Sequence, residues 1–174
     1  MARVNWTRWI AICAAASLAA CTAPGTAQGE SAQGEAPDYT VNAQSGLEVV
    51  PLTITDGDKV HTFRVEVART PAQQAKGMMF RTEMADDTGM IFPFQIPKMA
   101  SFWMRNTVIS LDLVFVRQDG TIESIAANAE PYSLEGIRSG EPVAMVLEIR
   151  GGLAKELGIS AGDTVHWEDS RKAR

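Results

Sequence analysis

The sequence predicts a single α+β domain of mainly β structure, in which short strands and two short helices form a barrel-like or sandwich-like arrangement. Two observations support this fold class. About seven short runs, several rich in β-branched residues, lie between residues 47 and 169 and alternate with turn sequences, whereas only two short segments carry helix signals. A doubly wound parallel sheet would need more and longer crossover helices.

The first part of the domain is expected to form a hairpin followed by a short helix. Residues 47–67 contain two β-branched runs on either side of an Asp-Gly-Asp-Lys turn, which is typical of a β-hairpin. Thr70 then serves as an N-cap, with Pro71 at the first helical position and Gln73 in the position that a capping box requires. Gly77 indicates that this helix is short.

The remaining elements follow from turn residues and apolar runs. Strands are expected over residues 89–94, 101–104, 111–116, 121–127, 143–149 and 164–167. A Gln-Asp-Gly turn makes residues 111–127 a second hairpin. Residues 153–157 predict a second short helix that Gly158 closes, and Pro93 and Pro97 restrict where hydrogen-bonded ladders can run.

The N-terminus predicts export and lipid attachment. Arg3 and Arg8 precede an uncharged stretch of twelve residues, 9–20, and the run Leu18-Ala19-Ala20-Cys21 closes the layout of a signal peptide. The stretch is too short for a permanent transmembrane helix, which needs roughly 20 apolar residues. Because Leu-Ala-Ala-Cys resembles the bacterial lipobox, we expect residues 1–20 to be removed and Cys21 to carry lipid. The alternatives are a plain signal peptide or a buried N-terminal helix.

A spacer and one domain are expected after the lipidated cysteine. Residues 21–46 are mostly Ala, Gly, Gln, Ser, Thr, Glu and Pro, a composition that cannot offset the entropy lost on ordering. A single globular domain is expected over residues 47–169, with a tail over residues 170–174. The protein is therefore expected on the periplasmic side of the cell envelope, lipid-anchored to the inner or the outer membrane.

Charge and cysteine content restrict the partners. Removal of residues 1–20 takes away two arginines and no acid, so the net charge changes from −5 to about −7. Nucleic acid, which needs a basic stripe, is not expected as a partner. Cys13 lies in the segment to be removed, so the mature chain has no cysteine pair for a disulfide.

No metal site and no cofactor are expected. His61 and His166 lie far apart in predicted strands, without the ligand spacing of a zinc site. Six methionines lie within residues 78–104, and thioethers can bind copper(I) in an exported protein. Their spacing is irregular, and methionine fills uneven cores well, so core packing is the preferred interpretation and copper binding the alternative.

The densest chemical segment is residues 101–112. We expect Trp103 to lie against the apolar part of a ligand, with Arg81, Asn106 and Asp112 making polar contacts, as in many small-molecule pockets. The alternative is structural: Trp103 is partly covered and Asp112 accepts hydrogen bonds from backbone N–H groups at the turn.

Enzymatic chemistry has little sequence support. The chain has no Gly-x-Ser-x-Gly, no phosphate-binding Gly-x-x-x-x-Gly-Lys and no Gly-x-Gly-x-x-Gly. A paired-carboxylate enzyme stays possible, with Asp112 and a second group such as Glu148 as acid and base.

Four segments carry a family resemblance: Lys-Gly-Met-Met-Phe-Arg at 76–81, Asp-Thr-Gly-Met-Ile-Phe at 87–92, Phe-Trp-Met-Arg-Asn-Thr with Leu-Asp at 102–112, and residues 158–165. In this order they closely resemble the bacterial and archaeal family called domain of unknown function 192. The resemblance implies a compact, mainly β domain, often exported, with no established activity. The family's signature corresponds here to Gly77, Met79, Arg81, Gly89, Met90, Phe92, Trp103, Asn106, Thr107, Asp112, Gly162 and Asp163.

Three functions remain as hypotheses. The first is a non-enzymatic envelope module, held at the membrane through Cys21, that binds a small molecule, a glycan or an envelope partner around Arg81, Trp103, Asn106 and Asp112. The second is an enzyme that uses paired carboxylates on a polar or glycan substrate. The third is a purely structural envelope lipoprotein, which a broad exposed apolar patch would favour.

Overall fold

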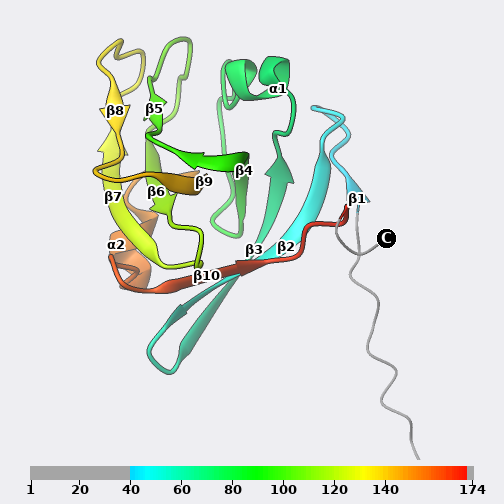
Figure 1. Cartoon of the computed structure of the whole chain (residues 1–174). Helices are drawn as coiled ribbons and strands as arrows, with labels where there is room; N and C mark the ends of the chain where they lie inside the picture. The colour runs from blue at the N-terminus through cyan, green and yellow to red at the C-terminus, as the bar shows by residue number, and fades with distance from the viewer. Residues whose placement is uncertain (1–39, 172–174) are drawn as a thin grey trace, which may run out of the picture. The chain divides into compact units, whose positions relative to one another are not determined.

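The computed structural model describes residues 40–171, whose path is shown in Figure 1. Its elements are, in chain order, β1 (Thr40–Val41), β2 (Glu48–Asp56), β3 (Lys59–Val67), α1 (Pro71–Lys76), β4 (Thr88–Lys98), β5 (Ser101–Phe102), β6 (Leu111–Val116), β7 (Ile122–Ala129), β8 (Ile137–Arg138), β9 (Val143–Arg150), α2 (Leu153–Leu157) and β10 (Thr164–Trp167). The expected signal peptide, Cys21, most of the spacer and the end of the tail lie outside the described residues.

The mainly β fold predicted from the sequence is confirmed. One sheet has the strand order β1-β2-β3-β4-β9-β6-β7, with β10 paired to β2, and β5 pairs with β8 in a small second sheet. The β3–β4 pair is parallel, and the other pairs are antiparallel. The large sheet is not a closed barrel, although an isolated bridge between Thr121 and Thr164 joins β10 to the start of β7.

Local signals in the sequence placed several elements correctly. The two predicted hairpins are β2–β3 and β6–β7. Helix α1 has the predicted capping box: the Thr70 side chain accepts from the Gln73 backbone, and the Gln73 side chain accepts from the Thr70 N–H. Helix α2 and strands β6 and β10 have the predicted bounds.

Strands β4, β6 and β9 lie in the middle of the sheet and are buried on both faces. The first core includes Ile91, Val114 and Leu147 and extends to helix α2 and strand β10. The second core, on the other face, includes Met90 and Leu113 and extends to the α1–β4 and β5–β6 connections. Because both faces are covered, these strands have few positions that tolerate a polar side chain.

The folded part begins earlier than the expected residue 47. Thr40 and Val41 pair with Val49 and Glu48, so β1 extends the sheet into the segment that we expected to be a spacer. The small polar side chains that follow β1 have partners in the fold, and composition alone does not reveal such partners.

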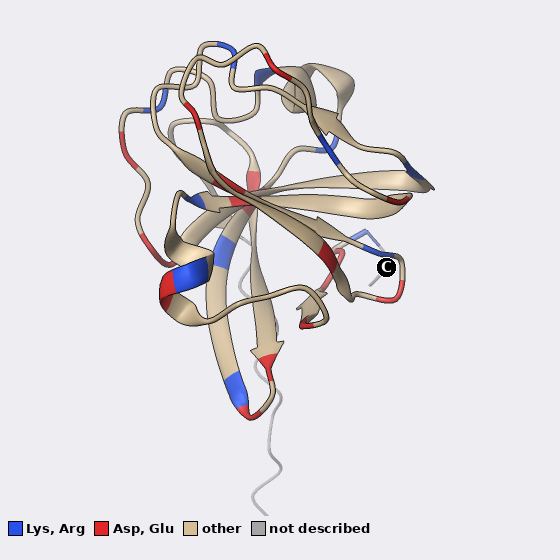
Figure 2. Ribbon diagram, turned by 90° about the vertical axis from the view of Figure 1, so that its left-hand side faces the viewer, with Lys and Arg blue, Asp and Glu red and all other residues tan. Residues whose placement is uncertain are grey.

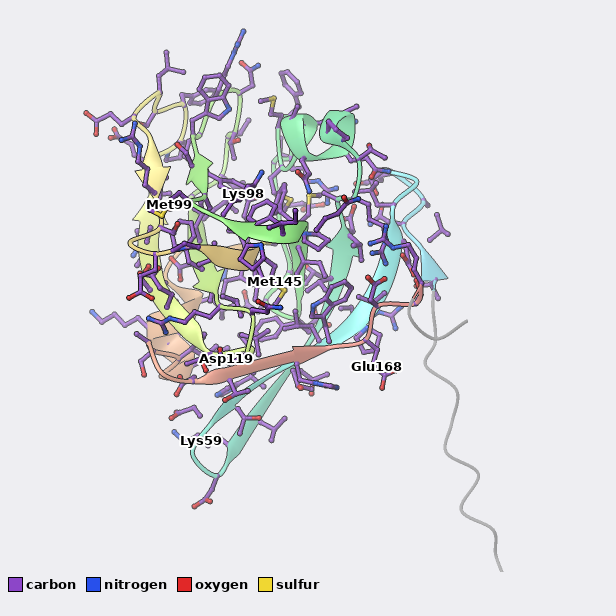
Figure 3. The ribbon with its side chains drawn as sticks, viewed as in Figure 1. Lys59, Lys98, Met99, Asp119, Met145 and Glu168 are labelled. Atoms are coloured by element: carbon purple, nitrogen blue, oxygen red, sulfur yellow. The ribbon has the colours of Figure 1, made fainter. Side chains whose placement is uncertain are left out.

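Charged residues are dispersed over the domain. Figure 2 shows Lys and Arg scattered among Asp and Glu along the ribbon, with no continuous basic stripe in that view. Figure 3 shows Lys59 at the tip of the β2–β3 hairpin, far from Lys98 and Met99 at the end of β4. Among residues 40–171, no helix has the length and apolar character needed to cross a bilayer.

Candidate functional site

Two hollows lie on either side of Met78, which lines both of them. We call the first the Arg81 pocket; its volume is about 690 Å³, and its polar lining includes Asn42, Arg64, Glu66 and Arg81. We call the second the Trp103 pocket; its volume is about 470 Å³, and its lining combines aromatic and thioether side chains with polar and charged ones. Both volumes fall in the range of small-molecule sites.

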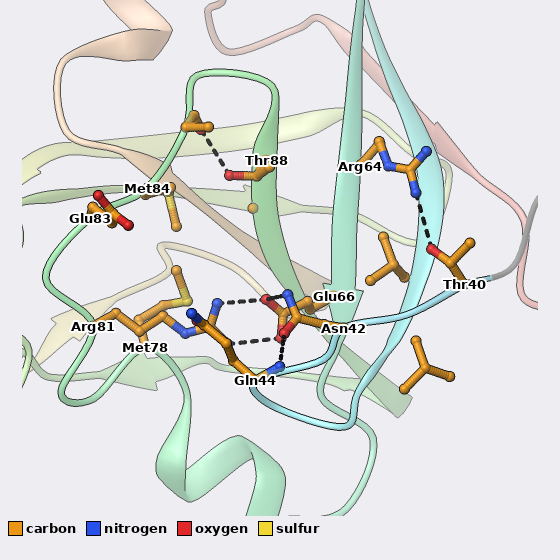
Figure 4. Close-up of a pocket in the computed structure, with 14 residues that line it drawn as sticks. Thr40, Asn42, Gln44, Arg64, Glu66, Met78, Arg81, Glu83, Met84 and Thr88 are labelled. Carbon is orange, nitrogen blue, oxygen red and sulfur yellow. Dashed lines mark hydrogen bonds and ion pairs between the residues drawn. The ribbon is translucent and has the colours of Figure 1, made fainter.

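An ion pair occupies the Arg81 pocket (Figure 4). The guanidinium of Arg81 donates to both carboxylate oxygens of Glu66, with Nη2 at 2.8 Å from Oε2. The Glu66 side chain is 6% exposed and that of Arg81 is 23% exposed. Planar pairing of this kind fixes both side chains, since each guanidinium N–H meets its own oxygen.

Glu66 also holds the N-terminal segment of the domain. The Asn42 amide donates to Oε1 at 3.2 Å, and the Ser45 hydroxyl donates to Oε2. The carboxylate thus joins the end of the expected spacer to the loop that carries Arg81. With its oxygens engaged in this way, Glu66 is a structural anchor in the Arg81 pocket rather than an open ligand contact.

The Trp103 pocket has apolar walls and a charged rim. Its walls include Met78, Met79, Met99, Phe92, Phe102 and Trp103. Phe92 and Phe102 contact each other edge to face, with ring centroids 5.0 Å apart. Lys76 and Lys98 also line it, and the ammonium of Lys98 lies 4.2 Å from the ring centroid of Phe94.

Glu148 is the acidic residue in the lining of the Trp103 pocket. The residue is 5% exposed, and its Oε2 atom has no hydrogen-bond partner among residues 40–171. Burial raises the pKa of Glu148 from its ordinary value of 4.5 to about 8, and the positive charge of Arg81 opposes part of this rise. The carboxyl is therefore mostly protonated at neutral pH, and a protonated carboxyl can donate one hydrogen bond.

The sheet register aligns the two glutamates. Glu66 on β3 pairs with Met90 on β4, and Met90 pairs with Glu148 on β9. Paired positions share a face of the sheet, so all three side chains point toward the second core. Arg81 forms an ion pair with the carboxyl of Glu66, whereas the carboxyl of Glu148 is uncharged because it keeps its proton.

Trp103 and Asn106 lie near the Trp103 pocket. The Trp103 side chain lines it and is 51% exposed, so the ring is not a core residue. The Asn106 amide contacts the sulfur of Met79, a wall residue, at 3.9 Å. Its backbone carbonyl accepts from the Phe80 N–H at 2.8 Å, which ties the turn to the α1–β4 connection.

Residues with unusual backbone angles lie around the turn at Asn106. Phe80, Asn106 and Tyr132 all have positive φ angles, of 66°, 56° and 62°. Asn adopts this conformation readily, but an aromatic residue there is strained. The Tyr132 N–H donates to the Thr107 carbonyl, so the three residues lie on adjoining loops. Strain of this kind is typical of binding and catalytic sites.

Asp112 has a structural role. It is fully buried, and its carboxylate accepts backbone hydrogen bonds from Asn128, Gly152 and Ala154 at 2.7–2.9 Å. These contacts hold the start of α2 and a residue of β7, so Asp112 accepts backbone hydrogen bonds as the structural alternative expected, but from these elements and not from the turn. A ligand has no access to its oxygens.

The expected acid–base pair of Asp112 and Glu148 is wrong. On β6 and β9, Asp112 pairs with Ile149, whereas Leu113 pairs with Glu148. Because neighbouring residues of a strand point to opposite faces, the two carboxyls lie on opposite sides of the sheet. The four candidate residues therefore separate: Arg81 lines one pocket, Trp103 and Asn106 lie at the other, and Asp112 belongs to neither.

Metal ligands are not assembled in the described part of the chain. No group of three or more His, Cys, Asp or Glu residues among positions 40–171 is placed to hold an ion. His61 pairs with Ile54 and His166 pairs with Thr53, so the histidines point to opposite faces. Among the methionines, Met78, Met90, Met104 and Met145 are buried in the two cores.

The two buried glutamates, Glu66 and Glu148, were not predicted from the sequence as binding residues. Glu66 was not a candidate, and Glu148 appeared only as a partner for Asp112. The available signal was a single acidic residue inside an otherwise apolar strand, as in Val-Ala-Met-Val-Leu-Glu-Ile over residues 143–149. In a strand covered on both faces, such a residue must be buried, and it then needs either a partner or a proton.

The fold and the site together define a class of protein: a mainly β domain with a mixed sheet and a pocket that contains a buried carboxyl. Within this class, the chain belongs to the DUF192 family, described as "Uncharacterized ACR", whose family model matches residues 52–167. This membership confirms the resemblance seen in the sequence.

Two solved structures are similar to this chain. A protein of unknown function from Novosphingobium aromaticivorans is 53% identical, with a TM-score of 0.73 over 77% of this chain and 94% of its own. A protein from Sinorhizobium meliloti, described as a candidate transcription regulator, is 41% identical, with a TM-score of 0.66 over 67% of this chain and 92% of its own. Comparison with curated proteins gives no match.

Proposed function

We propose that this protein is a lipid-anchored module of the cell envelope that binds a small molecule in the Trp103 pocket. One observation carries the binding proposal: the carboxyl of Glu148 is buried in the lining of that pocket and has an oxygen that no described residue of the chain contacts by a hydrogen bond. Buried polar groups in proteins nearly always have hydrogen-bond partners, so an exception beside a cavity indicates that a ligand supplies one.

Two further features support the pocket as the binding site. Trp103 presents a half-exposed ring at the pocket, although an aromatic side chain gains stability from burial. The strained backbone at Phe80 and Tyr132 lowers stability and persists around the same turn. Neither feature is needed to form the sheet or its cores.

The binding proposal can be tested by a fragment screen on the full chain with ligand-observed NMR. Fragments that bind the wild-type protein should not bind Trp103→Ala, and they should still bind Trp167→Ala, whose ring lines a different hollow. Trp103→Ala should lower the free energy of unfolding by only about 2 kcal/mol and leave the domain folded, because half of the ring is already exposed. Equal binding to both variants, or unfolding of Trp103→Ala, contradicts the proposal.

The membrane anchor rests on Leu18-Ala19-Ala20-Cys21, with the charge of about −7 placing the domain away from anionic lipid headgroups. Cells producing the full chain can be fed a palmitate analogue that allows detection of acylated proteins. The protein should carry the label, Cys21→Ser should lose it, and Cys13→Ser should keep it because position 13 lies in the removed segment. If Cys21→Ser still carries the label, the lipid is attached at another residue and the proposed anchor at Cys21 is wrong.

A protein partner in the envelope is the second candidate, and one observation favours it. Several large apolar side chains on the loops around the Asn106 turn are exposed, namely Phe80, Trp103, Val108, Tyr132 and Leu134. Backbone hydrogen bonds join these loops, so their apolar side chains lie in one region. A site-specific photo-crosslinker at position 134 should then capture an envelope protein in cells, whereas one at position 58, on the β2–β3 hairpin, should not.

The paired-carboxylate enzyme loses its named pair, since Asp112 and Glu148 lie on opposite faces. The description of the Sinorhizobium relative as a candidate transcription regulator is not carried over to this chain, because an acidic domain opposes binding to DNA.

A further inference from the structure

The chemistry of the Trp103 pocket points to a class of ligand. We infer that the pocket selects uncharged small molecules that present an oxygen acceptor, such as a ketone or amide carbonyl, to the carboxyl of Glu148 while their apolar part lies against Trp103 and the neighbouring rings. This inference rests on the proposed small-molecule function and adds the identity of the recognised group.

The donor is the carboxyl group of Glu148 itself. Its position in the second core, between Met90 and the β6 strand, keeps it away from water, and Oε2 has no partner within the fold. Burial holds the pKa of Glu148 near 8, so the group carries its proton under neutral conditions. A neutral carboxyl in an apolar site acts as a hydrogen-bond donor toward an oxygen acceptor.

The surrounding charge disfavours a cationic ligand. Lys76 and Lys98 both line the pocket, and Arg81 is close enough to Glu148 to lower its pKa. An ammonium ion in the pocket would meet Lys76 and Lys98 in the lining, the charge of Arg81 beyond it, and an uncharged carboxyl at Glu148. A bound anion would find lysines at the rim but would have to shed its water beside the apolar walls, which is unfavourable for a full charge.

The walls accommodate a ring or a short branched chain. The pocket volume of about 470 Å³ exceeds what one or two water molecules need and lies in the lower part of the range for ligand pockets. Phe92, Phe102 and the half-exposed Trp103 supply ring surfaces, and Met78, Met79 and Met99 supply flexible thioethers that adapt to different shapes. Gln74, Ser101 and Thr107 also line the pocket, and Glu148 is the buried carboxyl among these polar groups.

A matched pair of probes tests the inference on the full chain. Acetophenone and 1-phenylethylamine share a carbon skeleton, but the first carries a carbonyl oxygen and the second an ammonium group. Binding is measured by NMR of the chain labelled with ¹³C in its methionine methyl groups. The methyl signals of Met78, Met79 and Met99 report on the pocket, whereas that of Met145, in the first core, serves as an internal control.

Acetophenone is expected to shift the pocket methyl signals and to bind more tightly than 1-phenylethylamine. Its affinity should fall by up to about 30-fold between about pH 6.5 and about pH 9.5, because the donor is lost as the pH passes the pKa of Glu148. Glu148→Gln keeps an N–H donor and should bind acetophenone without this pH dependence. Glu148→Met keeps a similar volume, lacks the donor and should lose at least about tenfold in affinity at neutral pH.

The outcomes separate this inference from the proposed function. If 1-phenylethylamine binds more tightly, with affinity that rises through about pH 8, the site is a cation receptor and the inference is wrong while the binding function stands. Equal affinity of acetophenone for the wild-type protein and Glu148→Met also overturns the inference alone. If neither probe shifts the signals of Met78, Met79 or Met99, the binding function itself fails.

Discussion

Glu66 and Glu148 lie in one row across the sheet, on either side of Met90, but their carboxyls are accommodated in different ways. Glu66 is paired with Arg81, whereas Glu148 retains its proton because it is buried. Arg81 acts on both, by direct pairing with the first and by its field at the second.

Removal of Arg81 should be strongly destabilising. In Arg81→Met the buried carboxylate of Glu66 loses its ion pair, and we expect a loss of about 3 kcal/mol in the free energy of unfolding, measured with urea. Arg117→Met is the matched control, because its partner Glu141 is largely exposed, and it should lose less than about 1 kcal/mol. Similar losses in both variants would show that the Arg81 pair is not a buried anchor.

Glu148 should make the protein less stable as the pH rises. Its pKa is higher in the folded chain than in the unfolded chain, so its contribution is complete below about pH 4.5 and is lost as the pH rises through about 8. Between these values the slope should approach about 1.4 kcal/mol per pH unit. Glu148→Gln should remove this component, as followed by urea unfolding at several pH values.

The control for this experiment is Glu141→Gln, which replaces an exposed carboxylate and should retain the wild-type slope. A Glu148→Gln variant with an unchanged slope would mean that Glu148 is ionised in the folded protein.

Asp112 should act on stability and not on ligand binding. Asp112→Asn places an NH₂ group against backbone N–H donors, and we expect a loss of about 2–4 kcal/mol, with faster hydrogen exchange at Gly152 and Ala154. Asp119→Asn alters an exposed carboxylate that also accepts a backbone N–H, and it should change stability little. A stable Asp112→Asn variant with impaired ligand binding would restore Asp112 to the site.

Strain at Phe80 should be visible as a stabilising substitution. Phe80→Gly relieves an aromatic residue of its positive φ and is expected to raise the free energy of unfolding, by up to about 1 kcal/mol, in thermal unfolding. Leu134→Gly is the control, since Leu134 has the same 69% exposure without a positive φ, and it should lower stability. If both glycine variants lose stability equally, Phe80 is not strained.

Elements that depend on residues close together in the chain were predicted correctly from the sequence. The capping box at Thr70 and Gln73 and the turn of the β6–β7 hairpin depend on neighbours in the chain, so their residues reveal them. Strands β1 and β8 have two residues each, too few to show a period, and their pairing partners are distant in sequence. The expected start at residue 47 failed for the same reason.

The site was predicted only in part, because side-chain direction depends on strand register. Trp103 lines a pocket and its contact with a ligand stays a prediction, whereas Asp112 and Glu148 could be assigned to opposite faces only once β6 and β9 were aligned. A register shift of one residue would have placed both carboxyls on one face. Register is set by contacts across the whole sheet, which a single sequence does not display.

The double coverage of β4, β6 and β9 has a consequence for motion. Backbone amides in these strands should exchange most slowly with deuterium, since opening them disrupts both cores at once. Glu148 projects from this slowest part, whereas Trp103 and Asn106 belong to loops outside the large sheet. The pocket therefore combines a rigid carboxyl at Glu148 with a flexible wall at Trp103. We expect it to select the polar group of a ligand and to accept different shapes in the apolar part.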